Sequence, residues 1–450
     1  MTRIRMAYFS PLNPLPTGIS DYSEELLPEL AEFADVDLFV NGYAPSNPVI
    51  RERFAIYDYA EFPARQAEMS YAINLYQMGN SLHHTAIYHM LTRYPGVVVL
   101  HDVVLHHFFL EMNAVRNNPV DYLREMAYNK GTIGIKTGLA VLRGAQQPPF
   151  FEYPLIGRIV DSGLATVVHN HYAQDVVKAQ TGRLARIIPQ HVIPPSQITH
   201  SERIAQRNAL GIPPDAVVFG AFGHATPAKR LDVVLRAFRR LKALLPESYL
   251  LIVGRQSPDD WLSAIVDELG LRDSVVITGP VSMDRFLAAI AASDVCVNLR
   301  YPTAGETSAS LLRIMAAGKP AIVSDVGWFS ELPDDCCFKI PVDASEITTL
   351  YQAMRDLAAY DSLRVGMGTR SREFVLRQHS IRQSVERYIG VIEETIENAR
   401  FRRVSLLDSA TLGYHAHDRT TVLSKKTDAT EASEALRTEI ESSLAELGLL

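Results

Sequence analysis

Short apolar segments alternate with amphipathic helical patterns along almost all of this 450-residue chain. Runs such as Ile4–Phe9 and Val97–Leu100 have the length of strands, and the stretches between such runs repeat their apolar residues at helical spacing. This order predicts parallel sheets covered by helices, because consecutive parallel strands need a crossover connection. The chain is longer than one hydrophobic core usually organises, so we expect two α/β domains.

A cluster of prolines interrupts the alternation between residues 189 and 214, around a short polar helical segment. The alternation restarts at Val217. Such a break is typical of a linker between domains. The predicted units are a first domain over residues 1–195, a linker over 196–214 and a second domain over 215–378.

Three segments fall outside the simple alternation. Residues 115–157 contain several glycines and a Gln-Gln-Pro-Pro-Phe-Phe run, and they form either helices with a mobile loop over a cleft or a plain surface insertion. Residues 379–400 predict one long helix. Residues 401–450 read as a polar tail, in which Ala429–Leu450 has the spaced leucines of an amphipathic helix. That helix either docks on a partner or on the chain itself, or stays solvated.

Composition excludes some classes of protein. The net charge is −7 and no long Lys/Arg run occurs, which argues against nucleic acid as a partner. No apolar run reaches the roughly 18 residues that span a bilayer, and the N-terminal apolar stretch is too short for a signal peptide. The three cysteines, including the adjacent Cys336 and Cys337, indicate reduced thiols in a cytoplasmic protein.

The segment Pro302–Asp325 concentrates groups that suit an anionic ligand. Glu306, Thr307 and Ser308 precede an apolar-periodic helix, and a short buried strand follows it. Free N–H groups and the helix dipole favour phosphate at such a position. An ordinary capped helix between two strands would show the same pattern, because Ser and Thr are common at helix starts.

Other candidate positions follow strand ends in the first domain. Gly18 lies in a proline-containing turn after the first strand, and the sequence there lacks the G-x-G-x-x-G fingerprint of nicotinamide cofactors. His101 and Asp102 directly follow Val97–Leu100. A histidine placed there can hydrogen-bond a substrate hydroxyl, or it can be a structural residue in a turn.

In the second domain, Gly223 follows a strand, and Lys229 and Arg230 begin the next helical pattern. Two cations beside a glycine turn suit a pyrophosphate, although an exposed helix face would look alike. His106 with His107, and Asp35 with Asp37, lack the ligand number and spacing of a metal site, so we predict no metal site.

Together these motifs resemble the family 4 (group 1) retaining glycosyltransferases of the GT-B fold, over roughly residues 3 to 395. The resemblance rests on the Thr17-Gly18-Ile19 loop, on His101-Asp102, on Lys229 before a helix, and on the Gly305-Glu306 run that ends in Gly-Lys-Pro-Ala-Ile-Val-Ser-Asp. It implies two Rossmann-like domains that face a central cleft. The first would bind the acceptor, the second would bind the nucleotide of a sugar donor, and the helix over 379–400 would cross back to the first.

The resemblance also implies roles for individual residues. His101 would contact the transferring sugar, Lys229 with Arg230 would neutralise the diphosphate, and Glu306 would contact sugar hydroxyls. The implied catalytic residues are His101, Lys229 and Glu306. The implied donor-binding residues are Gly18, Gly223, Arg230, Thr307 and Ser308. Asp102, Arg300 and Arg313 are further candidates.

Two departures from the family pattern stand out. Members usually carry two glutamates eight positions apart, but Arg313 occupies the second position and Glu306 comes one place late. The ribose contact of the second glutamate is therefore in question, and Arg313 either contacts phosphate or lies on a solvated face. The usual Gly-Arg pair of the diphosphate site reads Gly223-His224, so Arg230 would supply the missing charge.

The resemblance predicts transfer of a hexose, with retention of configuration, from a UDP- or GDP-linked sugar to a glycan, lipid-linked or small-molecule acceptor. It implies no cofactor and no metal. Surface polysaccharide biosynthesis is the expected setting, with at most peripheral contact with the inner membrane face. The alternatives are a GT-B scaffold or nucleotide-sugar-binding protein without catalysis, and an enzyme that epimerises or phosphorolyses its substrate.

Overall fold

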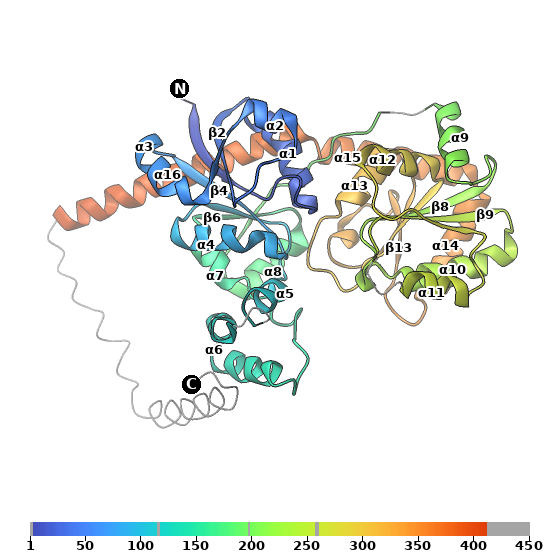
Figure 1. Ribbon diagram of the computed structural model, residues 1–450, viewed down its shortest axis with the longest axis horizontal. Helices are drawn as coiled ribbons and strands as arrows, with labels where there is room; N and C mark the ends of the chain where they lie inside the picture. Colours follow the sequence, from blue (N-terminus) through green and yellow to red (C-terminus); the bar gives the residue numbers. More distant parts are fainter. Residues whose placement is uncertain (1–2, 115–117, 197–198, 257–260, 412–450) are drawn as a thin grey trace.

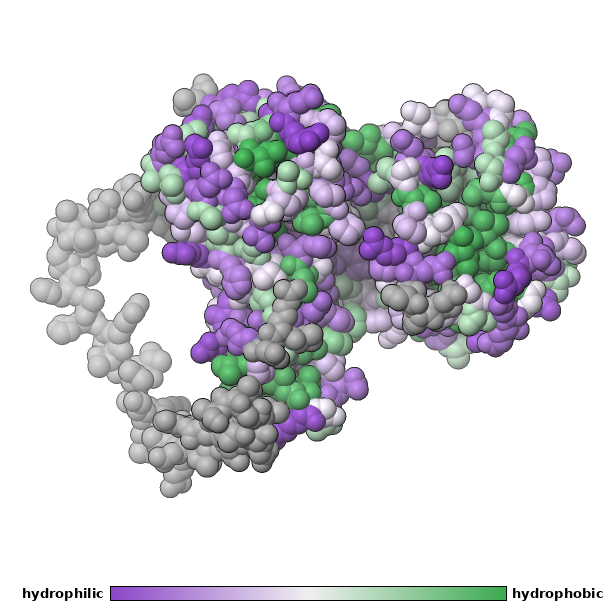
Figure 2. All heavy atoms as spheres, viewed as in Figure 1, coloured by the Kyte–Doolittle hydropathy of each residue, from purple (hydrophilic) through white to green (hydrophobic). Residues whose placement is uncertain are grey.

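The computed structural model describes residues 3–114, 118–196, 199–256 and 261–411. These residues form two α/β domains that lie side by side, each with one parallel sheet between layers of helices (Figure 1). The predicted fold class is confirmed. The space-filling view shows two lobes that meet across a hollow (Figure 2).

The sheet of the first domain has the strand order β3-β2-β1-β4-β5-β6-β7, and all pairs are parallel. Its strands are β1 (Ile4–Phe9), β2 (Ala34–Val40), β3 (Ala55–Asp58), β4 (Ile73–Met78), β5 (Val97–Leu100), β6 (Ala165–Val168) and β7 (Arg186–Ile187). The sequence patterns missed β3, because this short edge strand has no buried residue and so no apolar run.

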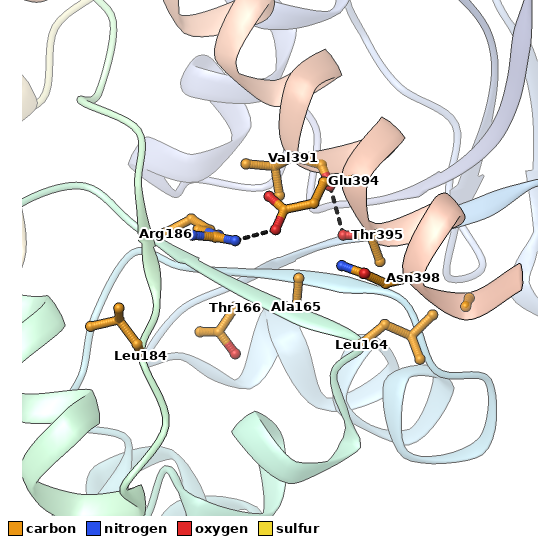
Figure 3. Close-up of a pocket in the computed structure, with 10 residues that line it drawn as sticks. Leu164, Ala165, Thr166, Leu184, Arg186, Val391, Glu394, Thr395 and Asn398 are labelled. Atoms are coloured by element: carbon orange, nitrogen blue, oxygen red, sulfur yellow. Dashed lines mark hydrogen bonds and ion pairs between the residues drawn. The ribbon is translucent and has the colours of Figure 1, made fainter. Parts of the chain in front are cut away.

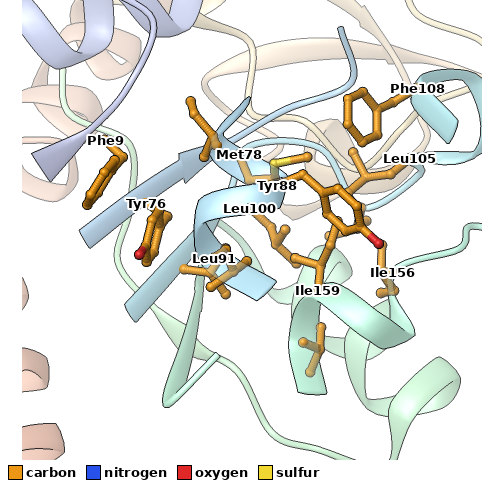
Figure 4. Packing of buried hydrophobic residues seen from close by; sticks show 14 of the residues in the cluster. Phe9, Tyr76, Met78, Tyr88, Leu91, Leu100, Leu105, Phe108, Ile156 and Ile159 are labelled. Atoms are coloured by element: carbon orange, nitrogen blue, oxygen red, sulfur yellow. The ribbon is translucent and has the colours of Figure 1, made fainter. Parts of the chain in front are cut away.

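Helices cover both faces of this sheet. The longer ones are α1 (Gly18–Leu30), α2 (Pro48–Arg53), α3 (Phe62–Met69), α4 (Thr85–Arg93), α6 (Pro119–Leu142), α7 (Gly157–Ser162) and α8 (His171–Thr181), and a short α5 (His106–Phe109) runs into a π-turn over Leu110–Ala114. Aromatic residues dominate one face: Phe9 stacks on Tyr76 at 4.6 Å between ring centroids (Figure 4). This dense packing makes the strand ends a rigid base for the loops that follow them.

The irregular segment between residues 115 and 157 is helical over α6. The helix breaks at Gly131, whose φ of 59° and ψ of −142° are not helical. Its two halves lie away from the sheet, at the outer end of the first domain (Figure 1).

The second domain contains a six-stranded parallel sheet in the order β10-β9-β8-β11-β12-β13. Its strands are β8 (Val217–Phe222), β9 (Ser248–Val253), β10 (Val275–Ile277), β11 (Val295–Asn298), β12 (Ala321–Ser324) and β13 (Cys337–Ile340). Its helices are α10 (Leu231–Leu244), α11 (Trp261–Glu268), α12 (Met283–Ala292), α13 (Ala309–Ala316), α14 (Glu346–Ala359) and α15 (Asp361–Gln378). Strand β13 was not predicted; it is a short edge strand that pairs only with β12 among the described strands.

The predicted linker contains helix α9 (His200–Ala209), which packs on the second domain. The buried Arg207 anchors it, because its guanidinium donates to the Ala292 carbonyl at 3.0 Å and pairs with Asp294 at 2.7 Å. The linker helix therefore belongs structurally to the second domain.

The final helix, α16 (Ile381–Thr411), returns to the first domain. Val385, Tyr388 and Ile392 enter the core of that domain, and the Tyr388 hydroxyl lies 2.7 Å from the Tyr22 hydroxyl of α1. The prediction that this helix ends at residue 400 is wrong, since its backbone stays helical to Thr411. The segment Ala429–Leu450 lies outside the described residues.

Candidate active site between the two domains

A cavity of 420 Å³ lies between the two domains, where loops from the carboxyl ends of both sheets converge. Parallel sheets bind ligands at these strand ends. Nine of the predicted site residues line it: Gly18, His101, Asp102, Gly223, Lys229, Arg300, Glu306, Thr307 and Ser308. The cavity therefore joins motifs that lie far apart in the sequence.

Glu306 is held firmly at the cavity wall. One carboxylate oxygen lies 2.8 Å from Arg300 Nε, and the other accepts hydrogen bonds from the Thr303 hydroxyl at 2.9 Å and the Ala304 amide at 2.8 Å. Two hydrogen bonds and one ion pair hold this carboxylate in a fixed orientation. Arg300, a further candidate in the sequence, is thus the charge partner of Glu306.

The N-terminus of α13 forms the neighbouring wall. Ser308 caps this helix, because its hydroxyl accepts a hydrogen bond from the Leu311 amide at 3.3 Å. Ala309 and Ser310, in the first turn, also line the cavity. Backbone N–H groups and the helix dipole favour an anion at this end of the helix, and the anion site that the sequence predicts here stays a prediction.

Both domains shape the loop that carries Glu306. The side-chain amide of Asn170, in the first domain, donates through Nδ2 to the Gly305 carbonyl and to the Thr307 hydroxyl, both at 3.0 Å. The Val103 amide donates to the Ala304 carbonyl at 2.7 Å. Gly305 has a φ of +82°, and a Cβ on it would come within 2.3 Å of the Val103 side chain. Only glycine fits where the domains approach this closely.

Lys229 is a buried lysine on the second-domain side, and its residue is only 9% exposed. Burial, reinforced by the positive charge of Arg300, holds the pKa of Lys229 well below its usual value, while Glu306 acts in the opposite direction. A lysine that burial makes costly to charge gains most from an anionic partner.

His101 lies at the end of β5, as predicted, but both of its ring nitrogens have protein partners. Nε2 lies 2.7 Å from the Gln77 amide oxygen, and Nδ1 lies 3.2 Å from His169 Nε2. Burial and the neighbouring histidines hold the pKa of His101 well below its usual value, so the ring is neutral. A neutral imidazole has one nitrogen that donates a hydrogen bond and one that accepts. Both contacts of His101 can therefore be hydrogen bonds when the Gln77 side chain turns its amide nitrogen, and not its oxygen, toward Nε2.

Asp102 is the second carboxylate at the first-domain wall. Burial raises its pKa to about 7, and the Glu306 charge acts in the same direction. The Asn80 amide, which donates to Asp102 at 2.9 Å, and Arg300 oppose that rise. Asp102 therefore changes its charge near neutral pH.

Two predicted residues point elsewhere. The Arg230 guanidinium pairs with Glu346 at the start of α14, and Arg230 does not line the cavity. Arg313 Nη2 donates to Glu25 of α1 at 2.6 Å and also lies outside the cavity lining. Both guanidinium groups thus pair with a carboxylate in the structure. The solvated face predicted as one alternative for Arg313 is wrong, because that residue is buried. The phosphate contacts of Arg230 and Arg313 stay predictions.

The sequence patterns missed Asn170, Gln77 and His169, which hold the loop of Glu306 and the ring of His101. Asn170 and His169 directly follow β6, so the strand-end rule that selected His101 also applied to them. Gln77 is a polar residue inside a buried strand, and that burial was the available signal.

No group of three or more His, Cys, Asp or Glu side chains that could hold a metal ion occurs in the described part of the chain. Within the same residues, no helix is long and apolar enough to cross a membrane.

A larger cavity, of 670 Å³, lies on the outer side of the first domain between β6, β7 and α16 (Figure 3). Aliphatic and polar residues share its walls, and Arg186 and Glu394 form an ion pair there. It lacks the convergent strand-end groups of the interdomain cavity.

The arrangement of two Rossmann-like domains around a cleft defines the GT-B fold. HepE of Anabaena, in complex with UDP and glucose, superposes with a TM-score of 0.62 at 15% identity, covering 87% of this chain and 100% of that chain. A glycosyltransferase from Rickettsia africae superposes with a TM-score of 0.64 at 13% identity, covering 88% and 100%. These likenesses establish the fold.

Residues 202–374 match the family model of the group 1 glycosyl transferases. D-inositol 3-phosphate glycosyltransferase of Stackebrandtia nassauensis is 33% identical over 145 residues, which cover 30% of this chain and 32% of that protein. The protein of the same name from Mycolicibacterium vanbaalenii is 26% identical over 257 residues, covering 52% and 54%. The chain spans about a third to a half of the length of these relatives.

Proposed function

We propose that this protein transfers a sugar from a nucleotide-diphosphate sugar to an acceptor in the cleft between its domains. The observation that carries the proposal is the convergence of Lys229, Glu306 and the α13 N-terminus on one interdomain cavity. A cation and a helix N-terminus suit the diphosphate, and an oriented carboxylate suits sugar hydroxyls. The solved complexes of HepE with UDP and with UDP-glucose support this class of donor.

The chemistry follows from where charge develops. When the bond between the sugar C1 and the diphosphate oxygen breaks, negative charge grows on the leaving phosphate and positive charge on the sugar ring. Lys229 and the amides of Ser308–Ser310 would stabilise the leaving group, while Glu306 would hold the sugar by its hydroxyls. Arg300 acts through Glu306, because it fixes that carboxylate.

We further propose retention of configuration without a covalent sugar–enzyme intermediate. Glu306 is tied by Arg300, Thr303 and the Ala304 amide, so it is a poor nucleophile. The acceptor oxygen would bond to C1 on the face that the diphosphate leaves, and the departing phosphate oxygen would take the acceptor's proton. The first domain would bind the acceptor. We expect no requirement for a metal ion.

The test uses the full chain with a panel of UDP-, GDP- and ADP-sugars and follows release of the free nucleotide. We expect release with at least one UDP- or GDP-sugar, unchanged turnover in EDTA, and a product anomer that matches the donor by NMR. The Glu306→Ala variant is the negative control. An inverted anomer, or loss of turnover on chelation, contradicts the mechanism. Nucleotide binding without sugar release would instead favour a binding or scaffold protein.

The setting proposed from the sequence is glycan or surface polysaccharide biosynthesis in the cytoplasm, with at most peripheral membrane contact. The names of the relatives point to another acceptor class, since both are D-inositol 3-phosphate glycosyltransferases. The acceptor panel should therefore include inositol phosphates beside lipid-linked and oligosaccharide acceptors. Product formation with one class and not with the others decides between them.

A further inference from the structure

Arg313 and Glu25 form a direct ion pair between the two domains. Arg313 lies on α13, and its Nη2 donates to Glu25 Oε1 on α1 at 2.6 Å, although the residues are 288 positions apart. The Arg313 side chain is 11% exposed and that of Glu25 is 22% exposed. Neither residue lines the interdomain cavity. The pair thus lies behind the cavity wall, where it contacts the protein and not a ligand in the cavity.

The surroundings of Glu25 favour this partner over others. Its second oxygen faces His191 Nε2 at 3.6 Å. Burial, together with the neighbouring His169 and Arg313, lowers the pKa of His191 to about 3, so this ring is neutral. Burial raises the pKa of Glu25, and the charge of Arg313 acts against that rise. Loss of Arg313 would therefore leave a partly buried carboxylate without its cationic partner.

The two helices that this pair joins carry opposite walls of the cavity. Helix α1 begins at Gly18, and Tyr22, one turn before Glu25, packs its ring against His101 at 4.7 Å between centroids. Helix α13 begins beside Ser308, at the anion-binding wall. Because each helix is rigid, the distance between Glu25 and Arg313 helps to set the distance between these walls, together with the Asn170 and Val103 contacts across the same boundary.

We propose that Glu25 and Arg313 are positioning residues: their ion pair holds the Gly18 wall at its working distance from the α13 N-terminus. The site that they position is the donor site of the proposed function. The inference rests on that function only for the identity of the ligand that binds there. Arg313 affects the cavity only by pairing with Glu25, and it makes no contact with the donor.

A charge-swap experiment tests this proposal. The variants are Arg313→Glu, Glu25→Arg and the double variant Glu25→Arg with Arg313→Glu. Each single variant places like charges together, so we expect UDP, as the probe, to bind about tenfold more weakly and amides of residues 18–25 to exchange hydrogen faster. The double variant restores an attractive pair, and we expect UDP affinity to return to within about threefold of wild type.

The matched control is Arg186→Glu, which reverses one charge of the Arg186–Glu394 pair on the outer side of the first domain. It should leave UDP affinity unchanged. Arg313→Lys keeps the charge and should retain most of the affinity even where a reversed variant folds poorly. Where a donor is turned over, the single variants should raise its KM more than they lower kcat, since the reacting groups are untouched.

The proposal is overturned if Arg313→Glu binds UDP like the wild type, or if the double variant is no better than the single ones. Hydrogen exchange is measured without ligand, so it reports on the ion pair even if the wild-type protein binds no UDP. A wild-type protein that binds no UDP would contradict the proposed function. The hydrogen-exchange data would then still test whether the ion pair holds the two walls together.

Discussion

Arg300 Nε lies 2.8 Å from Glu306 Oε1, and both side chains are mostly buried at the wall of the interdomain cavity. The pair places one carboxylate and one guanidinium within reach of Lys229, whose pKa responds to both. These three groups, together with Asp102, set the balance of charge in the cavity. A bound dianionic diphosphate would change that balance.

Glu306→Gln keeps the shape of the side chain and removes its charge. We expect kcat to fall about 10- to 100-fold, because the amide holds sugar hydroxyls and Arg300 less well. The melting temperature should drop by a few degrees, about 2–4 °C per kcal/mol lost, since Arg300 loses its charge partner. Initial rates with thermal melts measure both effects. Glu331→Gln, at a carboxylate that accepts from His171 and Tyr172 amides outside the cavity lining, is the control and should retain kcat.

Gly18→Ala separates ligand approach from folding. A Cβ at Gly18 would meet no heavy atom within 4 Å, so the folded protein accommodates it. Because Gly18 lines the cavity, we expect the added methyl to keep the donor from approaching the backbone and donor KM to rise about tenfold. Gly390→Ala on α16, also with no heavy atom within 4 Å, is the matched control. Equal KM values for Gly18→Ala and Gly390→Ala would show that Gly18 does not contact the donor.

Lys229 should take up a proton when UDP binds. Its pKa is held well below the usual value in the empty cavity by burial and by Arg300, and a bound diphosphate favours the charged form. Titration calorimetry in two buffers of different ionisation enthalpy measures this uptake. In Lys229→Met the uptake should vanish and UDP should bind about 10- to 100-fold more weakly. Uptake that persists in the variant would assign the proton to another group.

Asp102 should make stability depend on pH. Its pKa is about 7 in the folded protein, so between pH 4 and 7 the folded state binds more protons than the unfolded state. The stability from this protonated carboxyl is present below pH 4 and is lost as the pH rises toward 7. The Asp102→Asn side chain stays neutral at every pH. The free energy of unfolding of the variant minus that of the wild type should therefore rise from pH 5 to 7 and stay constant above pH 7.

Denaturant melts at several pH values test this, with Asp273→Asn at an exposed position as the control substitution. The facing charges of Glu306 and Arg300 stay in place in both proteins. A difference between Asp102→Asn and the wild type that does not change with pH would contradict the raised pKa.

Local pattern predicted most of the fold. The strands Ile4–Phe9, Val97–Leu100, Val217–Phe222 and Ala321–Ser324 have the predicted bounds, because each is an apolar run that ends where turn residues begin. The edge strands β3 and β13 were missed, since edge strands bury less and so carry a weaker apolar signal. The end of α16 was misplaced because a helix end of polar sequence resembles a polar tail.

The sequence by itself determined the two parallel sheets and the strand-end positions of Gly18, His101, Lys229 and Glu306, because periodicity and turn residues act over neighbouring positions. Only the tertiary structure decided where the long cations point. Arg230 faces Glu346, Arg300 faces Glu306, and Arg313 faces Glu25 across the domain boundary. A guanidinium on a flexible stem pairs with whichever carboxylate the packing brings near, and for Arg230 and Arg313 that carboxylate lies 116 and 288 positions away in the sequence.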